Sequence, residues 1–176
     1  MIATHDGKCI RFNESDVRVM GRDTQGVRSI KLAKDDYVVD MAVITEGNQI
    51  ITISENGYGK RSDESEYRTQ TRGGKGVKAG NFSAKTGKLV NLKQIGENQD
   101  IMLIADSGII IRLKAEDISL IGRDTQGVKI MRLKDGAKIV CVSVAEHEEE
   151  EESPAEEVEN TLTEEQIEYA EQETEE

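Results

Sequence analysis

Short apolar segments alternate with polar turns along residues 1–145. Residues 50–54 and 101–105 are apolar runs of strand length, and residues 109–113 form another. The pairs Asn56-Gly57 and Ser107-Gly108 follow the first two runs. Glycine readily adopts the positive φ that tight hairpin turns need, so such pairs between apolar runs indicate hairpins. The pattern predicts β-structure.

A second set of paired segments follows later in each unit. Residues 128–133 and 138–144 flank Asp135-Gly136, another hairpin signal. The equivalent pairs are residues 27–32 with 37–44, and residues 77–82 with 88–95. The sequence thus predicts about four strands in each unit of about fifty residues, the size of a propeller blade. Three further segments fit either a single helical turn or a loop: residues 14–17, 64–67 and 115–118.

Three copies of one unit account for this regularity. The heptapeptide GRDTQGV occurs at residues 21–27 and at residues 122–128, and TRGGKGV at residues 71–77 stands midway between them. Glycines 7, 57 and 108 are each followed four residues later by an arginine and nineteen residues later by another glycine. We place the repeats at about residues 1–48, 49–98 and 99–145. The repeated arginines, which either brace the blade or bind a ligand, are Arg11, Arg61 and Arg112.

Three blades are few for a propeller, which closes with about four to eight and otherwise leaves open strand edges. Aligning Gly7 with Gly57 also places Met1 opposite Ile51, inside a predicted strand. We therefore expect the chain to be the C-terminal part of a longer polypeptide and of a larger disc. A partial solenoid is the alternative.

Charge divides the chain into two parts. The formal net charge is −12, yet residues 146–176 hold 16 of the 35 acidic residues and no lysine or arginine. Residues 1–145 therefore carry 23 basic against 19 acidic residues, a net charge of +4. We expect residues 146–176 to be a disordered acidic tail, because they contain few apolar residues.

The remaining composition predicts a soluble, cytosolic protein. The longest apolar run is five residues, so we expect no membrane span. The two cysteines, Cys9 and Cys141, do not make a disulfide framework. The few scattered cysteines and histidines also give no recognisable metal site.

The segment QTRGGKG at residues 70–76 resembles the Gln-(Arg/Lys)-Arg-Gly-Gly-(Arg/Lys)-Gly box in the C-terminal domain of the DNA gyrase A subunit. IRFNESDVR, MGRDTQGVR and ENGYGKR fit the same family in the same order. The resemblance implies an all-β, propeller-like β-pinwheel of about six blades that exchange outer strands. Residues 1–145 would then be about three four-stranded blades of that disc. The topoisomerase IV A subunit is a close relative of this family and a second possibility.

The resemblance also implies a function: sequence-nonspecific binding and wrapping of double-stranded DNA, which guides negative supercoiling by a type II topoisomerase. Thr71 stands where the family usually has a basic residue, and the family's defining box lies in the first blade. The segment at residues 70–76 therefore corresponds to a secondary box.

Basic residues around consecutive glycines suit phosphate binding on physical grounds as well. Glycines expose backbone N–H groups and allow close approach, while arginine and lysine neutralise phosphate charge. Repeat two is the most basic, with 9 basic against 5 acidic residues, whereas Asp-Thr replaces Gly-Gly in the other copies. The alternative is that these loops are tight turns with solvated charges. The expected DNA-binding residues are Gln70, Arg72, Gly73, Gly74, Lys75, Gly76, Lys78, Arg22 and Arg123.

The resemblance places the chemistry outside this chain. Its tyrosines do not lie in the context of the family's nucleophile, and no Walker-type phosphate loop occurs. We expect the chain alone to catalyse nothing and to hold no cofactor, with ATP and magnesium bound by other domains. The implied partners are the rest of the gyrase A subunit, together with the gyrase B subunit, in an A2B2 complex located in the cytoplasm on the chromosome.

A protein-binding propeller fragment remains the alternative from a different functional class. A basic stripe along the outer rim, formed with Arg22, Arg72, Lys75 and Arg123, would favour DNA. Apolar or mixed loops on a flat face would favour a protein partner.

Overall fold

The computed structural model describes residues 1–134 and 136–147, so Asp135 of the predicted hairpin and the acidic tail from residue 148 onward lie outside the described residues. The described part is all-β, as predicted, and no helix in it is long and apolar enough to cross a membrane. Repeat one contains β1 (Ile2–Thr4), β2 (Lys8–Ile10), the 3-10 turn η1 (Glu14–Asp16) and β3 (Val38–Met41). Repeat two contains β4 (Gln49–Ser54), β5 (Tyr58–Asp63), η2 (Glu64–Glu66), β6 (Val77–Lys78) and β7 (Leu89–Ile95). Repeat three contains β8 (Gln99–Ala105), β9 (Ile110–Lys114), η3 (Ala115–Asp117), β10 (Val128–Lys129) and β11 (Ile139–Glu146).

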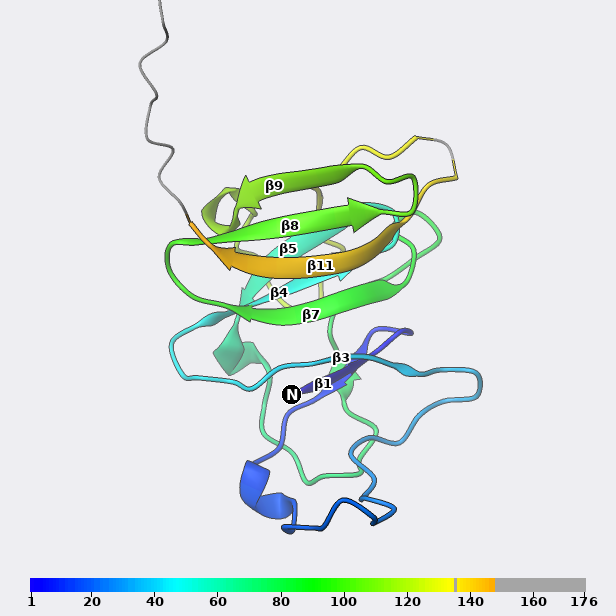
Figure 1. Ribbon diagram of the computed structural model, residues 1–176, viewed down its shortest axis with the longest axis vertical. Coiled ribbons are helices and arrows are strands. Elements are labelled where there is room, and N and C mark those ends of the chain that lie inside the picture. Colours follow the sequence, from blue (N-terminus) through cyan, green and yellow to red (C-terminus); the bar gives the residue numbers. More distant parts are fainter. Residues whose placement is uncertain (135, 148–176) are drawn as a thin grey trace, which may run out of the picture.

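The strands form three antiparallel sheets that follow one another in sequence order, with β8, β9 and β11 in the upper part of Figure 1 and β1 and β3 below the other labelled strands. The strand orders are β3-β1-β2-β6, β10-β5-β4-β7 and β11-β8-β9. Two sheets therefore have the predicted four strands, and the third has three. The segments 14–17, 64–67 and 115–118, which fitted a helical turn or a loop, each begin with a 3-10 turn.

Neighbouring repeats exchange their outer strands, as the family resemblance implied. In repeat two, β6 pairs with β2 of repeat one, with Lys78 opposite Lys8 and Val77 opposite Cys9. In repeat three, β10 pairs with β5 of repeat two, with Val128 opposite Gly59. We call the boundary between two neighbouring repeats a seam. Each described seam is therefore closed by a short strand from the repeat that follows.

The exchange shows that the second set of predicted hairpins was wrong. Residues 77–82 and 88–95 do not pair with each other, because β6 joins β2 and β7 joins β4. Likewise β10 joins β5, whereas β11 pairs with β8. Residues 27–32 form no strand. Apolar alternation specifies which residues of a strand are buried, but it does not specify the partner strand.

The core lies between adjacent sheets, and β4 contributes to both sides of it. Ile51 and Ile53 belong to the cluster shared with repeat three, which includes Leu103. Ile50, on the opposite face of the strand, belongs to the cluster shared with repeat one, which includes Ala3. Because both faces of β4 are buried, apolar residues do not alternate with exposed polar ones along it, and Ile50, Ile51 and Ile53 are all buried.

Glycine at the seam lets the exchanged strand approach its neighbour. Gly76 and Gly127 precede β6 and β10 and have φ values of 70° and 82°. A Cβ on Gly76 would lie 2.4 Å from the Cys9 carbonyl oxygen, and one on Gly127 would lie 2.7 Å from the Gly59 carbonyl oxygen. Both the backbone conformation and the close approach therefore require glycine.

Two of the repeated arginines, Arg11 and Arg61, brace the seams. Arg11 donates to the Glu64 carbonyl oxygen at 3.1 Å and forms an ion pair with the Glu64 carboxylate. Arg61 donates to the Ile118 carbonyl oxygen at 2.6 Å and to the Glu116 carbonyl oxygen at 2.8 Å. Each thus ties its own repeat to the 3-10 turn of the next one.

Candidate nucleic-acid interface

The box loop, residues 70–76, lies at the seam between repeats one and two. The Gly73 amide donates to the Ser29 carbonyl oxygen at 2.7 Å, and the Lys31 amide donates to the Gly74 carbonyl oxygen at 2.8 Å. The Gln70 amide donates to the Arg11 carbonyl oxygen at 2.8 Å. Backbone hydrogen bonds to repeat one therefore fix the shape of the loop.

Arg72 and Arg123 occupy equivalent positions and make equivalent contacts. Arg72 Nε donates to the Asp16 carbonyl oxygen at 3.1 Å, at the end of η1, and its Nη1 donates to the Arg28 carbonyl oxygen. Arg123 Nε donates to the Glu66 carbonyl oxygen at 3.1 Å, at the end of η2, and its Nη1 donates to the Lys78 carbonyl oxygen. Both arginines therefore hold a seam together, and each keeps further N–H donors for another acceptor.

Lys75 and Arg22 differ from these two arginines. Both side chains are exposed, and neither forms a hydrogen bond or ion pair with the described part of the chain. Gln70 is partly buried, and its side-chain nitrogen has no hydrogen-bond partner among the described residues. The structure thus brings the predicted residues of the box into one loop, with Lys75 directed to solvent, and places Arg22 and Arg123 at the corresponding loops of repeats one and three.

The two seams carry exposed lysines, of which the sequence predicted only Lys78. Lys8 and Lys78 are exposed and stand directly opposite each other across β2 and β6. Like charges in this position destabilise a sheet unless an anion lies nearby. Lys78 has a distant ion pair, at 3.9 Å, with exposed Asp124. We call Lys8, Lys78, Lys85 and Lys129 the rim lysines.

Tyr58 forms the equivalent pair on the next seam. It stands opposite Lys129 across β5 and β10. The Lys129 and Lys85 ammonium nitrogens lie 5.1 Å and 5.6 Å from the centre of its ring. The aromatic ring attracts both cations and holds them close together at the surface. The seam between repeats two and three therefore also presents two positive charges.

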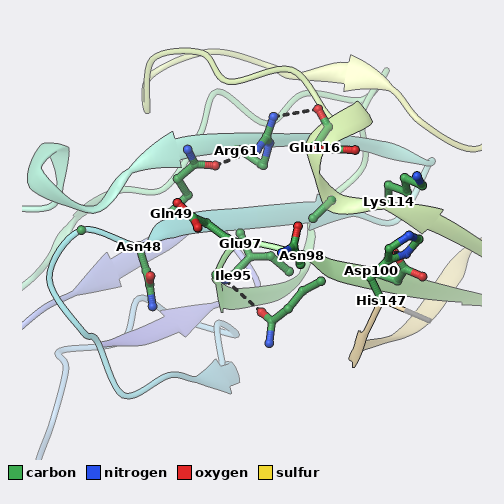
Figure 2. A pocket seen from close by; sticks show the side chains of 14 residues that line it. Asn48, Gln49, Arg61, Ile95, Glu97, Asn98, Asp100, Lys114, Glu116 and His147 are labelled. Carbon is green, nitrogen blue, oxygen red and sulfur yellow. Dashed lines mark hydrogen bonds and ion pairs between the residues drawn. The ribbon is translucent and has the colours of Figure 1, made fainter. Parts of the chain in front are cut away.

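A polar hollow of about 570 Å³ lies between repeats two and three, where Figure 2 shows Arg61 beside Gln49 and Glu116. Asp100 accepts hydrogen bonds in this hollow from Arg112 Nε at 2.7 Å, and its other oxygen lies 2.9 Å from His147 Nδ1. Burial opposes ionisation of Asp100, but these hydrogen bonds lower its pKa below the ordinary value. Arg61, Asp100 and Arg112 already form hydrogen bonds with other groups of the chain here, so the hollow is a braced seam.

One known protein family matches the chain in three segments, which correspond to the three repeats. The family described as DNA gyrase C-terminal domain, beta-propeller, matches residues 1–45, 48–95 and 99–146. The chain belongs to this family. The box loop and both seams with rim lysines fall within the matched segments.

Whole proteins similar to the chain are much longer. The DNA gyrase A subunit of Fibrobacter succinogenes is 44% identical over 136 residues, which cover 77% of this chain and 15% of the relative. The DNA gyrase A subunit of Escherichia coli is 40% identical over 152 residues, covering 86% of this chain and 17% of the relative. The chain thus spans about one sixth of the length of these relatives.

Two solved structures have a similar fold. The structure of a DNA gyrase A C-terminal domain is 31% identical with a TM-score of 0.71, covering 81% of this chain and 49% of that one. The C-terminal domain of DNA topoisomerase IV gives a TM-score of 0.77 at 22% identity, covering 82% of this chain and 46% of that one. The second likeness concerns the fold alone. The β-pinwheel of the gyrase C-terminal domain is therefore the fold of this chain.

Sequence reasoning missed the rim lysines other than Lys78, and it missed buried Lys60 on β5. Lys8 directly follows the hairpin glycine Gly7, and Lys129 lies two residues after Gly127. Those offsets were visible in the repeat alignment. What the sequence did not show is that strand exchange places these residues on the same seams as Lys78 and Tyr58.

Proposed function

We propose that residues 1–147 bind duplex DNA through its phosphates and act as the DNA-wrapping module of a gyrase. The observation that carries this proposal is the pair of Lys8 and Lys78, two exposed lysines placed directly opposite each other on a seam, of which Lys78 lies 3.9 Å from exposed Asp124. A phosphate backbone lying over this seam would neutralise both charges. Exposed Lys75, in the box loop beside the same seam, supplies a third.

The arrangement suits contact with phosphate rather than base recognition. Ammonium groups on short strands neutralise backbone charge and position the duplex, but they carry no sequence information. The second seam offers Lys85 and Lys129 at an equivalent place one repeat further on. Successive seams therefore give phosphate contacts repeated along the array, which favours a DNA path that follows the array and bends with it.

The chain would be one part of a larger complex. We propose that it works with the rest of the gyrase A subunit, together with the gyrase B subunit, in an A2B2 complex that introduces negative supercoils. ATP and magnesium would be bound by the other domains, and the complex would act on the chromosome in the cytoplasm. The support is family membership, because the named relatives are DNA gyrase A subunits.

Fluorescence anisotropy with a labelled mixed-sequence duplex, measured over a series of salt concentrations, tests the proposal. The logarithm of the affinity should fall linearly with the logarithm of salt concentration, by about 0.9 for each phosphate neutralised. The double variant K8M/K78M should therefore reduce the slope by about 1.8.

The matched control is K88M/K138M, which removes two exposed lysines that pair with acidic residues. Lys88 lies 2.6 Å from Asp6, and Lys138 lies 3.0 Å from Glu55. This control should change the slope little. Equal effects of the two double variants would contradict the proposed site, and an absence of DNA binding by the unmodified chain would favour the protein-binding alternative.

A further inference from the structure

Lys60 is the only buried lysine among the described residues, with 2% of its surface exposed. Its ammonium group donates to the Gly122 carbonyl oxygen at 3.1 Å, to the Arg123 carbonyl oxygen, and to the Thr125 carbonyl oxygen at 3.0 Å. Thr125 Oγ1 lies 3.3 Å away and donates in turn to the Gly122 carbonyl oxygen at 2.7 Å. These acceptors satisfy the three donors of the ammonium group. Lys60 therefore holds the loop of repeat three, residues 122–127, from beneath.

The box loop of repeat two has a different support. The equivalent of Lys60 in repeat one is Ile10, which is fully buried. Ile10 Cδ1 lies 3.7 Å from the place that a Cβ of Gly74 would occupy. A Gly-Gly loop thus rests on an apolar side chain, whereas the Asp-Thr loop of repeat three rests on a buried cation.

Charged and titratable groups surround Lys60 from three elements. Glu66 belongs to η2, Arg123 and Asp124 belong to the loop, and Cys9 lies on β2. Burial lowers the pKa of Lys60 to about 8, an effect that Arg123 strengthens and that Glu66, Asp124 and Cys9 oppose. The positive charge beneath the loop is therefore present at neutral pH and is lost under mildly alkaline conditions.

We propose that Lys60 is a positioning residue for DNA binding, which fixes the loop of repeat three and offsets the negative charge of Asp124 so that the loop can lie against phosphate. This inference rests on the proposed function. Without the ammonium group, three carbonyl oxygens would lose their donor, and Asp124 would repel an approaching phosphate. The positive charge of Lys60 in repeat two thus compensates the negative charge of Asp124 in repeat three. The Asp-Thr loop can then contact DNA despite its aspartate.

The pH dependence of binding separates this role from a purely structural one. The folded-state pKa of Lys60 lies below its ordinary value of 10.5, so protonation favours the unfolded chain. Between about pH 8 and about pH 10.5, the contribution of Lys60 to the stability of the fold therefore increases with pH. DNA affinity should fall across the lower part of that window. A loss of DNA binding there cannot be attributed to unfolding caused by Lys60.

The experiment measures anisotropy of a labelled mixed-sequence duplex with the full chain at fixed salt, at about pH 7 and about pH 9, on either side of the Lys60 pKa of about 8. Wild-type affinity should fall by about tenfold, close to the smallest effect expected for losing a hydrogen bond to a charged group. K60M should bind about tenfold more weakly at the lower pH and show no further fall. K138M, the single-charge control, should keep the wild-type pH profile. K60M that binds like the wild type, or that shows the same pH profile, would overturn the proposal.

A second measurement needs no variant. In the free wild-type chain, the backbone amide resonances of Thr125 and Gln126 should shift with a midpoint near pH 8, because Lys60 binds this turn. Constant resonances would overturn the positioning role even if K60M failed to fold. A wild-type chain that binds no DNA at the lower pH would contradict the proposed function instead, and the resonances would still decide whether Lys60 positions the turn.

Discussion

Arginine and lysine in the box loop have different surroundings, although the sequence suggested one shared role. Arg72 donates to carbonyl oxygens of Asp16 and Arg28 in repeat one, while Lys75 faces solvent. The sequence identified both residues from their type and their spacing around Gly73-Gly74. It did not reveal that the guanidinium group of Arg72 also closes a seam, because that contact joins residues more than forty positions apart.

Arg72→Ala and Lys75→Ala should therefore affect different properties. Arg72→Ala should lower the free energy of unfolding by about 1–2 kcal/mol, because two carbonyl oxygens at the seam lose a charged donor. Lys75→Ala should leave stability nearly unchanged and weaken DNA binding. Urea unfolding and anisotropy on the same samples measure both properties. A Lys75→Ala chain destabilised as much as Arg72→Ala would contradict this division.

At the scale of elements, the strands were predictable and their partners were not. Residues 50–54 and 101–105 were predicted as strands from their apolar runs, and they lie within β4 and β8. The turns at Asn56-Gly57 and Ser107-Gly108 join the pairs β4–β5 and β8–β9 as predicted. Sequence proximity gave the correct partner there, because a two-residue turn leaves little choice. It gave the wrong partner for β6 and β10, which bind the preceding repeat.

The seam glycines give a test of strand exchange with an internal control. Gly26, Gly76 and Gly127 all have positive φ, but a Cβ on Gly26 would meet nothing within 4 Å. Gly26→Ala should cost only the backbone strain, about 1–2 kcal/mol. Gly76→Ala and Gly127→Ala should cost about 1–3 kcal/mol more, because the added methyl group collides with a backbone carbonyl of the neighbouring repeat.

Chemical denaturation of the three glycine variants would measure these free energies of unfolding. Gly26→Ala controls for the conformational cost that all three share. If the three variants lost the same stability, the close approach of β6 to Cys9 and of β10 to Gly59 would not be a feature of the folded chain.

For the whole molecule, charge is divided between a basic array and an acidic C-terminal segment. Residues 148–176 contain fifteen glutamates and no lysine or arginine, so removing them changes the formal net charge from −12 to +3. The described chain continues as β11 through Glu146, and the His147 amide donates to the Asn98 carbonyl oxygen at 3.0 Å. The acidic segment is therefore covalently attached to the array that carries the rim lysines.

A chain ending at His147 should bind duplex DNA more tightly than the full chain, most strongly at low salt. The glutamates compete with phosphate for the same cations, and salt screens both competitors. Anisotropy titrations at two salt concentrations measure the gain. A full-length chain with glutamine at those fifteen positions is the matched control and should bind like the shortened chain. If only the shortened chain gained affinity, bulk rather than charge would be the cause.

Strand exchange has a consequence for how such an array grows. The residues of a folded blade are not the same as the residues of one sequence repeat. In each of the first two blades, one outer strand comes from the next copy of the sequence. A gene segment of one repeat length, duplicated in tandem from any starting point, therefore supplies both a new receiving strand and a new donated one. Every internal seam made in this way is complete from the outset. Strand exchange between blades therefore requires no additional mutations, and evolution can change the number of blades by changing only the number of repeat copies.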